Sequence, residues 1–164
     1  MTTLQRMTQE EFLEWERETV PTYAAEKVAS EQWKEAEAFA LARKSFDELL
    51  PQGLTTPGNL FFTVRDQDAR VDVGTLWVAV QERAGKRVAY VYDVAIKPEH
   101  QRKGHATRAF RALEDEVRSL GLAGIALHVF GHNAAAHALY VKLGYRPTNI
   151  NMYKPIEATS CAGT

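Results

Sequence analysis

The segment from Asp93 to Ala106 carries the residue types that bind an anion. It begins as an apolar strand, turns at Lys97-Pro98 into a basic stretch, and continues as a helix that starts near Gly104. The first backbone N–H groups of a helix have no partner inside the helix, and they lie at the positive end of its dipole. A phosphate bound there accepts several hydrogen bonds at once. The segment therefore predicts a phosphate-binding turn.

Four residues of this turn are expected to contribute to phosphate binding. Gly104 allows close approach or a positive φ, and Ala106 leaves the helix start uncrowded. Arg102 and Lys103 add cationic side chains. The alternative is an ordinary strand-to-helix connection with a basic loop, so the rest of the chain has to decide. Two other phosphate motifs, Gly-x-x-x-x-Gly-Lys-Ser/Thr and Gly-x-Gly-x-x-Gly, do not occur in the sequence.

Length and composition are those of a soluble globular domain. The chain has 164 residues with 45% hydrophobic and 25% charged residues, which is enough to bury roughly two thirds of the unfolded surface. We predict one domain over residues 1–155 and a flexible tail over 156–164. The net charge of -1 gives no reason to expect nucleic acid or membrane as a partner. The single cysteine, Cys161, fits a reducing cytoplasm, and no apolar run reaches the roughly 20 residues of a membrane span.

The first third of the chain predicts a short strand and two helices. Thr3 to Met7 alternates weakly and is a candidate first strand. The capping box Thr8-x-x-Glu11 predicts a helix start, which Pro21 is expected to break or kink. Ser30 is the predicted N-cap of the second helix. The glutamates of the first helix form an acidic face, for which a solvated surface is favoured over a site for a cationic ligand.

The middle of the chain predicts three consecutive antiparallel strands. Leu60–Val64, Val73–Val80 and Val88–Ile96 are rich in apolar and β-branched residues. A short polar connection separates the first two, and a hairpin turn with Gly85 precedes the third. The third strand ends at the predicted phosphate-binding turn.

The last part of the chain predicts a crossover and a second small helix. An amphipathic helix runs from Ala106 to Leu120, and the distance between the strands on either side of it suits a crossover to a parallel strand at Ile125–Phe130. Asn133 is a good N-cap for a short alanine-rich helix. Tyr145–Tyr153 is predicted to hold a last strand or hairpin, interrupted by Pro147.

Two patterns in this order resemble those of the Gcn5-related N-acetyltransferase (GNAT) family. The turn matches its Gln/Arg-x-x-Gly-x-Gly/Ala pattern, and the last helix matches its Asn-x-x-Ala-x-x-Leu-Tyr-x-x-x-Gly-Phe pattern with an aromatic change at the end. The matching residues are Gln101, Gly104, Ala106, Asn133, Ala136, Tyr140, Gly144 and Tyr145. The resemblance implies an α/β fold with a mixed, mainly antiparallel sheet that is splayed between its fourth and fifth strands and flanked by helices.

The resemblance also implies acetyl-CoA as co-substrate. The single cysteine and the spacing of the histidines give no reason to expect a metal. Acetyl-CoA would lie in the wedge between the two splayed strands, with its pyrophosphate at the turn. The residues that the resemblance assigns to it are Val94, Ala95, Ile96, Gln101, Arg102, Lys103, Gly104, His105, Ala106, Thr107, Asn133 and Tyr140. His105 stands where the family usually has an aliphatic residue, so either the helix start is more polar or this side chain touches the cofactor.

The implied reaction is direct attack of a primary amine on the acetyl group in a ternary complex. The Val94 N–H would stabilise the developing oxyanion. Tyr140 matches the general acid of many members. His128 and Asp93 are both candidate general bases, and a water chain is the third possibility.

Two other functions remain open at this point. One is a regulatory module that binds acetyl-CoA without turnover, and the other is transfer of a longer acyl group, with a pocket near Trp77 and Tyr90. The amine acceptor, a small molecule or a protein amine, is not specified by any motif. Homodimers are common in the family, and the sequence neither supports nor contradicts one.

Overall fold

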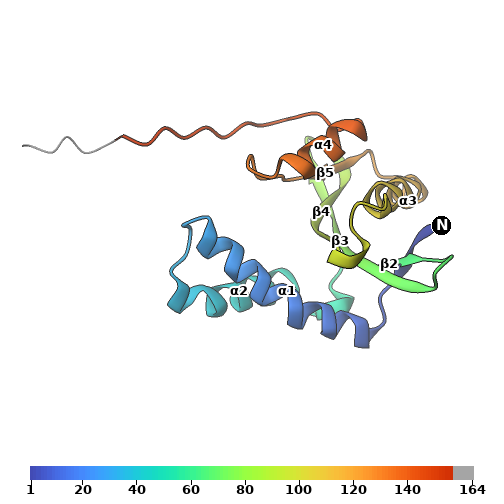
Figure 1. The fold of residues 1–164 in the computed structure, drawn as a ribbon, viewed down its shortest axis with the longest axis horizontal. Helices are drawn as coiled ribbons and strands as arrows, with labels where there is room; N and C mark the ends of the chain where they lie inside the picture. Colours follow the sequence, from blue (N-terminus) through green and yellow to red (C-terminus); the bar gives the residue numbers. More distant parts are fainter. Residues whose placement is uncertain (157–164) are drawn as a thin grey trace, which may run out of the picture. The chain divides into compact units, whose positions relative to one another are not determined.

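The computed structural model describes residues 1–156 of the chain, in two compact units. The first is Met1–His128, and it holds the sheet with the helices α1, α2 and α3 (Figure 1). The second begins at Val129 and holds helix α4. The prediction of one domain over residues 1–155 stays a prediction. The predicted tail and Cys161 lie, from residue 157 onward, outside the described residues.

The sheet of the first unit is mixed and mainly antiparallel, as predicted. Its strands are β1 (Thr2–Arg6), β2 (Asn59–Asp66), β3 (Val71–Arg83), β4 (Lys86–Ile96) and β5 (Ile125–Leu127). They lie side by side in chain order, each antiparallel to the next except β4 and β5, which are parallel. Helix α3 (His105–Ser119) makes the crossover between these two. Two short 3₁₀ turns, η1 (Gly53–Thr55) and η2 (Pro98–His100), precede β2 and α3.

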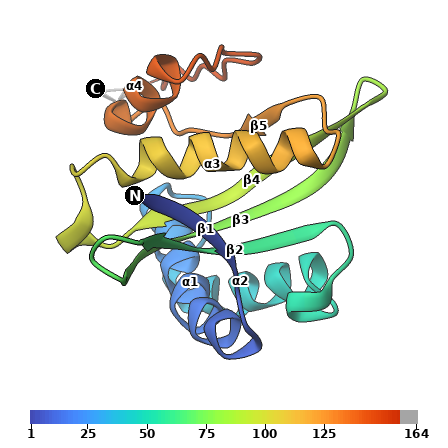
Figure 2. The same ribbon diagram turned by 90° about the vertical axis from the view of Figure 1, so that its right-hand side faces the viewer.

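Helices cover both faces of this sheet. Figure 2 shows α3 on one side and α1 (Gln9–Ala29) with α2 (Glu35–Leu49) on the other. The α1 and α2 side has an aromatic core in which neighbouring ring centroids lie 4.8–6.0 Å apart. Its rings belong to Phe12, Trp15, Phe46, Phe61 and Trp77. On the other side α3 buries Phe110 and Leu113.

Helix α1 begins at the predicted capping box but does not end where it was expected to. The Glu11 N–H donates to Thr8 Oγ1 (3.2 Å), and the Thr8 N–H donates to Glu11 Oε2 (2.6 Å). Pro21 lies inside the helix, so the predicted break there is wrong. Proline removes one internal hydrogen bond, and the buried side chains of Val20 and Ala24 on either side of it keep the helix packed.

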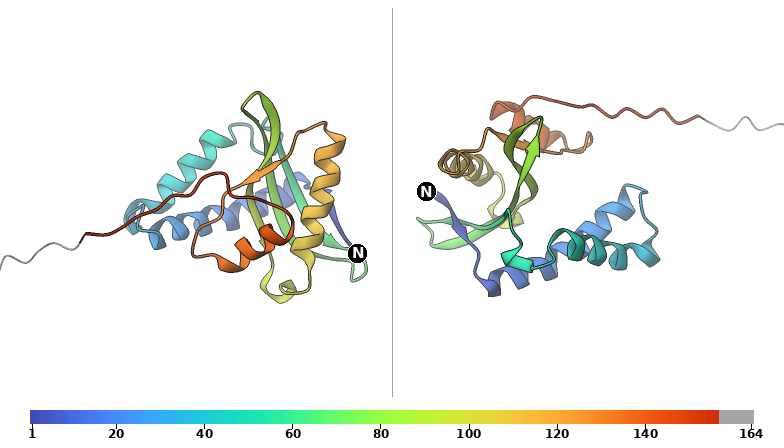
Figure 3. Two further views of the ribbon diagram at one scale, coloured as in Figure 1. Left: turned by 90° about the horizontal axis from the view of Figure 1, so that it is seen from above. Right: turned by 180° about the vertical axis from the view of Figure 1, so that it is seen from behind.

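The predicted start of the second helix is also wrong. Ser30 is the C-cap of α1, and α2 starts five residues later, with Lys34 as an N-cap that makes no side-chain capping bond. A serine can satisfy backbone groups at either end of a helix, and here its N–H and hydroxyl both donate to carbonyls of the last turn of α1. Both views of Figure 3 show the end of α1 and the start of α2 extending past the sheet.

Two strand predictions near the C-terminus need correction. The strand expected over Ile125–Phe130 ends at Leu127, and the next residue, His128, is exposed. The strand or hairpin expected within Tyr145–Tyr153 does not form. Ile150 and Met152 are exposed, so the apolar alternation in this stretch has no face to bury, and Pro147 cannot donate to a ladder. Among the described residues, no helix is long and apolar enough to cross a membrane.

Candidate active site

The sheet opens between β4 and β5. Three pairs join these strands, Ala89 with Ile125, Tyr90 with Ala126 and Val91 with Leu127. Beyond them β4 continues for five more residues, of which the last four, Asp93 to Ile96, pair with β3 alone within the described part of the chain. A parallel neighbour that stops so early leaves one edge of β4 available to another extended chain. This is the predicted splay between the fourth and fifth strands.

A β-bulge lies in β4 at the point where the opening begins. On β3, Trp77 opposes Asp93, but the next residue, Val78, opposes Val91. Tyr92 is therefore an extra residue on β4. A bulge of this kind bends the strand and changes which side each later backbone group faces.

The bulge turns the backbone of Val94 and Ile96 toward the opening. Before it, the Ala89 N–H donates toward β5, to the carbonyl of the residue that precedes that strand (2.9 Å). After it, the Lys97 N–H donates to the Val73 carbonyl on β3 (2.8 Å). The direction of the backbone N–H groups alternates along a strand. The N–H groups of Ala89 and Lys97, which are both odd-numbered, would therefore point to the same side if no extra residue lay between them. Because Tyr92 is an extra residue, the backbone N–H and C=O groups of the even-numbered Val94 and Ile96 face the open edge.

The predicted phosphate-binding turn closes one end of that edge. Gly104 is the N-cap of α3 and has φ +79°, a left-handed conformation that favours glycine. It supplies no side-chain cap, so the N–H groups of His105, Ala106 and Thr107 start the helix without that partner. A Cβ at Gly104 would lie 2.8 Å from a guanidinium nitrogen of Arg108. The left-handed conformation therefore favours glycine here, and a larger residue would also have to displace the end of the Arg108 side chain.

Arg108 braces the turn, and sequence reasoning missed it. Its Nε donates to Thr2 Oγ1 (2.8 Å), and a terminal nitrogen donates to the carbonyl of Lys103 (2.9 Å). The side chain thus ties the turn to the first strand of the sheet. Its position one helical turn after Gly104 was the available signal, but the partner on β1 is 106 residues away.

The other polar residues of the turn hold its backbone. Gln101 Nε2 donates to the Ile96 carbonyl (2.9 Å), which caps the end of the open edge. Lys103 Nζ donates to the carbonyl of Glu99 (2.8 Å). Arg102 is exposed and has φ +61°. Gln101 and Lys103 therefore use their side chains within the turn in this structure.

The side chain of His105 lies in the protein interior. It is only 4% exposed, and its Nδ1 lies 3.0 Å from Thr2 Oγ1 and 3.2 Å from a guanidinium nitrogen of Arg108. Burial lowers the pKa of His105, and the positive charge of Arg108 lowers it further. The imidazole therefore contacts Thr2 and Arg108, and the backbone of His105 lies in the first turn of α3. The predicted part of His105 in cofactor binding stays a prediction.

Asp93 lies on the opening beside the bulge and is half-buried. Trp15 Nε1 of α1 donates to its Oδ2 (3.3 Å). Burial raises the pKa of the Asp93 carboxyl; the Trp15 hydrogen bond acts in the opposite direction, and the charge of Glu26 raises the pKa further. An aspartate with a raised pKa is a stronger base than an ordinary one.

His128, the other candidate base, follows the last paired residue of β5. It therefore lies where the two strands part, as Asp93 does on β4. Its side chain is exposed, unlike that of Asp93. The first unit thus brings both candidate bases, the open edge and the turn to the same end of β4.

Asn133 and Tyr140 belong to the second unit and are described within it. Asn133 caps α4 (Ala134–Lys142) as predicted, because its Oδ1 accepts from the Ala136 N–H (3.1 Å). Tyr140 is buried, and its ring centroid lies 5.6 Å from that of Tyr145. Their roles toward acetyl-CoA stay predictions.

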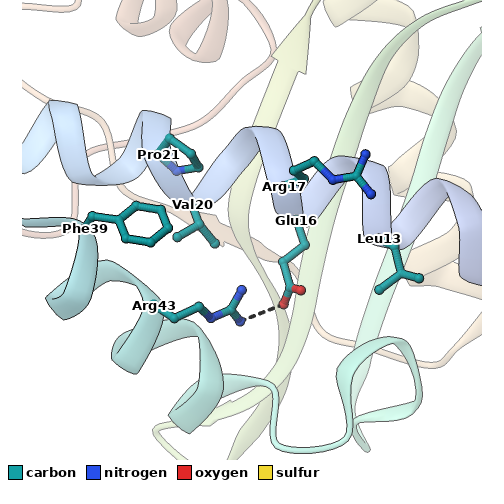
Figure 4. Close-up of a pocket in the computed structure, with 7 residues that line it drawn as sticks. All are labelled: Leu13, Glu16, Arg17, Val20, Pro21, Phe39 and Arg43. Atoms are coloured by element: carbon teal, nitrogen blue, oxygen red, sulfur yellow. Dashed lines mark hydrogen bonds and ion pairs between the residues drawn. The ribbon is translucent and has the colours of Figure 1, made fainter.

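A groove of about 490 Å³ lies elsewhere, between α1 and α2 (Figure 4). It is lined by Leu13, Glu16, Arg17, Val20, Pro21, Phe39 and Arg43. Arg43 donates to Glu16 across it (2.8 Å). Neither Asp93 nor any residue of the turn lines this groove, so it is separate from the opening in the sheet. No group of three or more His, Cys, Asp or Glu side chains within residues 1–156 is arranged to hold a metal ion.

Comparison with known proteins agrees with this geometry. Residues 10–145 match the model of the acetyltransferase (GNAT) family. The chain is 33% identical over 150 residues to YycN of Bacillus subtilis, described as an uncharacterized N-acetyltransferase, covering 92% of this chain and 96% of YycN. It is 34% identical over 155 residues to YdgE of the same organism, which has the same description, covering 94% and 98%. The crystal structure of YycN superposes with a TM-score of 0.88 at 32% identity, covering 96% of this chain and all of that one.

Proposed function

The chain belongs to the GNAT acetyltransferase family and is an N-acetyltransferase, and from this premise we propose that it transfers the acetyl group of acetyl-CoA to a primary amine. The observation that carries the proposal is the open edge of β4, whose backbone faces outward at Val94 and Ile96 and which ends at the turn before α3. A peptide-like edge followed by a helix N-terminus matches the two parts of the donor, an amide-containing arm and a pyrophosphate.

In this proposal the pantetheine arm pairs with the open edge as an added strand would. Its amide groups exchange hydrogen bonds with Val94 and Ile96, and the pyrophosphate accepts from the first N–H groups of α3. Gly104 lets the phosphate approach, and the brace from Arg108 keeps the turn in shape. Asn133 is the proposed contact from the second unit.

The chemical step is attack of the neutral amine nitrogen on the thioester carbonyl. A C–N bond forms, the C–S bond breaks, and the negative charge on the oxygen is stabilised by the Val94 N–H, an effect of about 2.7–4 kcal/mol per donor. We assign the base that takes the amine proton to Asp93, because its carboxylate is oriented by Trp15 and its pKa is raised. Tyr140 is the proposed acid that returns a proton to the CoA thiolate.

Calorimetric titration with acetyl-CoA tests the binding part. We expect Gly104→Glu to lose about 100-fold or more in affinity, because it adds a negative charge at the phosphate position and puts an L residue at φ +79°. Gly121→Glu is the matched control, since Gly121 lies past the other end of α3, also at positive φ (+64°), with no atom near its missing Cβ. Equal affinities for both variants and the wild type would contradict the assignment.

A thiol-release assay over a panel of amines tests turnover. Release of CoA with any amine supports the transferase, and release from longer acyl-CoA donors at equal rates would favour the wider acyl specificity. Binding of acetyl-CoA with no release on a broad panel would favour a regulatory module instead.

A further inference from the structure

We infer that the amine acceptor is a cation with a second positive charge on its chain, which lies along Tyr92 while the reacting nitrogen reaches Asp93 and the second charge faces Glu26. The inference rests on the proposed function and names the class of its acceptor. The residues that carry it lie in the first unit, on the side of the sheet covered by α1 and α2.

Tyr92 is a rigid, exposed aromatic platform. Its ring stacks on Trp77 with centroids 4.5 Å apart and planes at 17°, and Tyr90 meets it edge-on at 4.9 Å. Gln81 Nε2 donates to its hydroxyl (3.0 Å). Even with these contacts the side chain stays 37% exposed. An aromatic ring held this firmly and still open to solvent costs little conformational entropy when a ligand packs on it.

The bulge places this platform beside the proposed base. Tyr92 stacks on Trp77, Trp77 lies 5.5 Å from Trp15, and Trp15 bonds to Asp93. Neighbouring residues of a regular strand point to opposite faces, but these contacts put Tyr92 and Asp93 on the same face. An acceptor whose nitrogen is at Asp93 therefore has its chain next to the Tyr92 ring.

A second carboxylate lies further along α1. Glu26 is exposed and follows Trp15 by eleven residues, close to three helical turns, so both face the same side of the helix. Burial is the main cause of the raised pKa of Asp93 and of Tyr23, and the charge of Glu26 raises the pKa of both groups further. Figure 1 shows this end of α1 extending beyond the sheet.

The surface favours a cation on the chain of the acceptor. Aromatic faces and carboxylates both attract ammonium groups. The same helix already shows such a contact, because Lys27 Nζ lies 5.4 Å from the ring centroid of Tyr23 and 5.7 Å from that of Trp33. Arg83 occupies the ring of Tyr90 in the same manner at 4.8 Å, which leaves the ring of Tyr92 for the ligand. An acceptor with a carboxylate on its chain would be repelled by Glu26 and Asp93.

Three amines with one five-carbon chain test the inference directly. Cadaverine carries a second ammonium, pentylamine ends in a methyl group, and 5-aminopentanoate ends in a carboxylate. Their binding to the full chain saturated with CoA is measured by calorimetry, and acetylation is measured by thiol release. We expect cadaverine to bind about threefold to tenfold more tightly than pentylamine, and 5-aminopentanoate to bind most weakly.

Two variants assign the preference to its residues. Glu26→Gln removes the charge at constant size, and we expect it to bring cadaverine to the level of pentylamine. Glu14→Gln is the matched control, because Glu14 is also exposed on α1 but on another side of the helix, and it should keep the preference. Tyr92→Leu should weaken both amines several-fold, since it removes the ring on which either chain lies.

The outcomes separate this inference from the proposed function. Equal binding of all three amines, no binding of any, or a cadaverine preference unchanged in Glu26→Gln would overturn the inference. Thiol release without a charge preference would contradict the inference and leave the transferase intact. Cadaverine-selective binding without release on any amine would support the acceptor site and contradict the proposed turnover.

Discussion

The two halves of β4 belong to one continuous strand but have different surroundings. Residues 86–91 lead up to the bulge, with β3 on one side and β5 joining on the other over their last three residues. After the bulge at Tyr92, the half that ends at Ile96 pairs with β3 alone. One extra residue and the early end of β5 thus leave the second half of β4 with an open edge. The halves have similar apolar sequences, so the difference comes from pairing rather than composition.

The largest expected effect comes from the acid next to the bulge. Asp93→Asn should lower kcat/KM for acetyl transfer by about 10²–10⁴-fold, because the proposed general base is lost while the side-chain shape is kept. Steady-state thiol release measures it. His128→Gln should lose less than about tenfold, and the reverse order of the two losses would move the base to β5.

The next largest effect is expected at Gly74 of β3, which lies against Ala95 in the second half of β4. A Cβ at Gly74 would collide with the Ala95 carbonyl oxygen, so Gly74→Ala should lower the free energy of unfolding by about 1–3 kcal/mol and weaken acetyl-CoA binding. Gly124→Ala, beside the paired half, has no atom within 4 Å of its Cβ and should change stability by less than about 0.5 kcal/mol. Urea unfolding of both variants measures the contrast, and equal losses would refute it.

The same aspartate should cost stability where it aids catalysis. Because the folded-state pKa of Asp93 is raised, the native protein binds the proton more tightly than the unfolded chain. Its contribution is therefore most favourable at low pH and is lost as the pH rises through the raised pKa. Asp93→Asn should raise the thermal midpoint relative to wild type at neutral pH, and the gain should shrink toward acidic pH. A pH-independent difference would be inconsistent with a titrating Asp93.

A smaller effect should follow from removing the hydrogen bond to the base. The Trp15 N–H lowers the pKa of Asp93, so Trp15→Phe should shift the acidic limb of the kcat/KM profile to higher pH. Phe46→Leu is the control, because it alters the same aromatic core without touching Asp93. If both variants lower activity without moving the limb, Trp15 has only a packing role.

Local features of the site could be predicted from the sequence. Gly104 marks a positive-φ helix start, and the capping box at Thr8 and the alternation of β4 are signals within a few residues. The order of the strands and the parallel crossover followed from connection lengths. These are the features that short-range geometry controls.

The features that depend on distant residues could not be predicted in this way. The bulge at Tyr92 adds one residue to an otherwise ordinary apolar strand and leaves no mark in its pattern. The bond from Trp15 to Asp93 spans 78 residues, and the one from Arg108 to Thr2 spans 106. The predicted break or kink at Pro21 rests on a local cost, whereas the packing that keeps α1 continuous through Pro21 is tertiary.

Amide hydrogen exchange of β4 by NMR, with and without acetyl-CoA, tests the central claim most directly. In the free protein the Asp93 and Ala95 amides face β3 and should exchange slowly, while those of Val94 and Ile96 face the open edge and should exchange fast. Acetyl-CoA should slow Val94 and Ile96 and leave the other two unchanged. Protection that appears at Asp93 and Ala95 instead, or at none of the four, would contradict the binding edge.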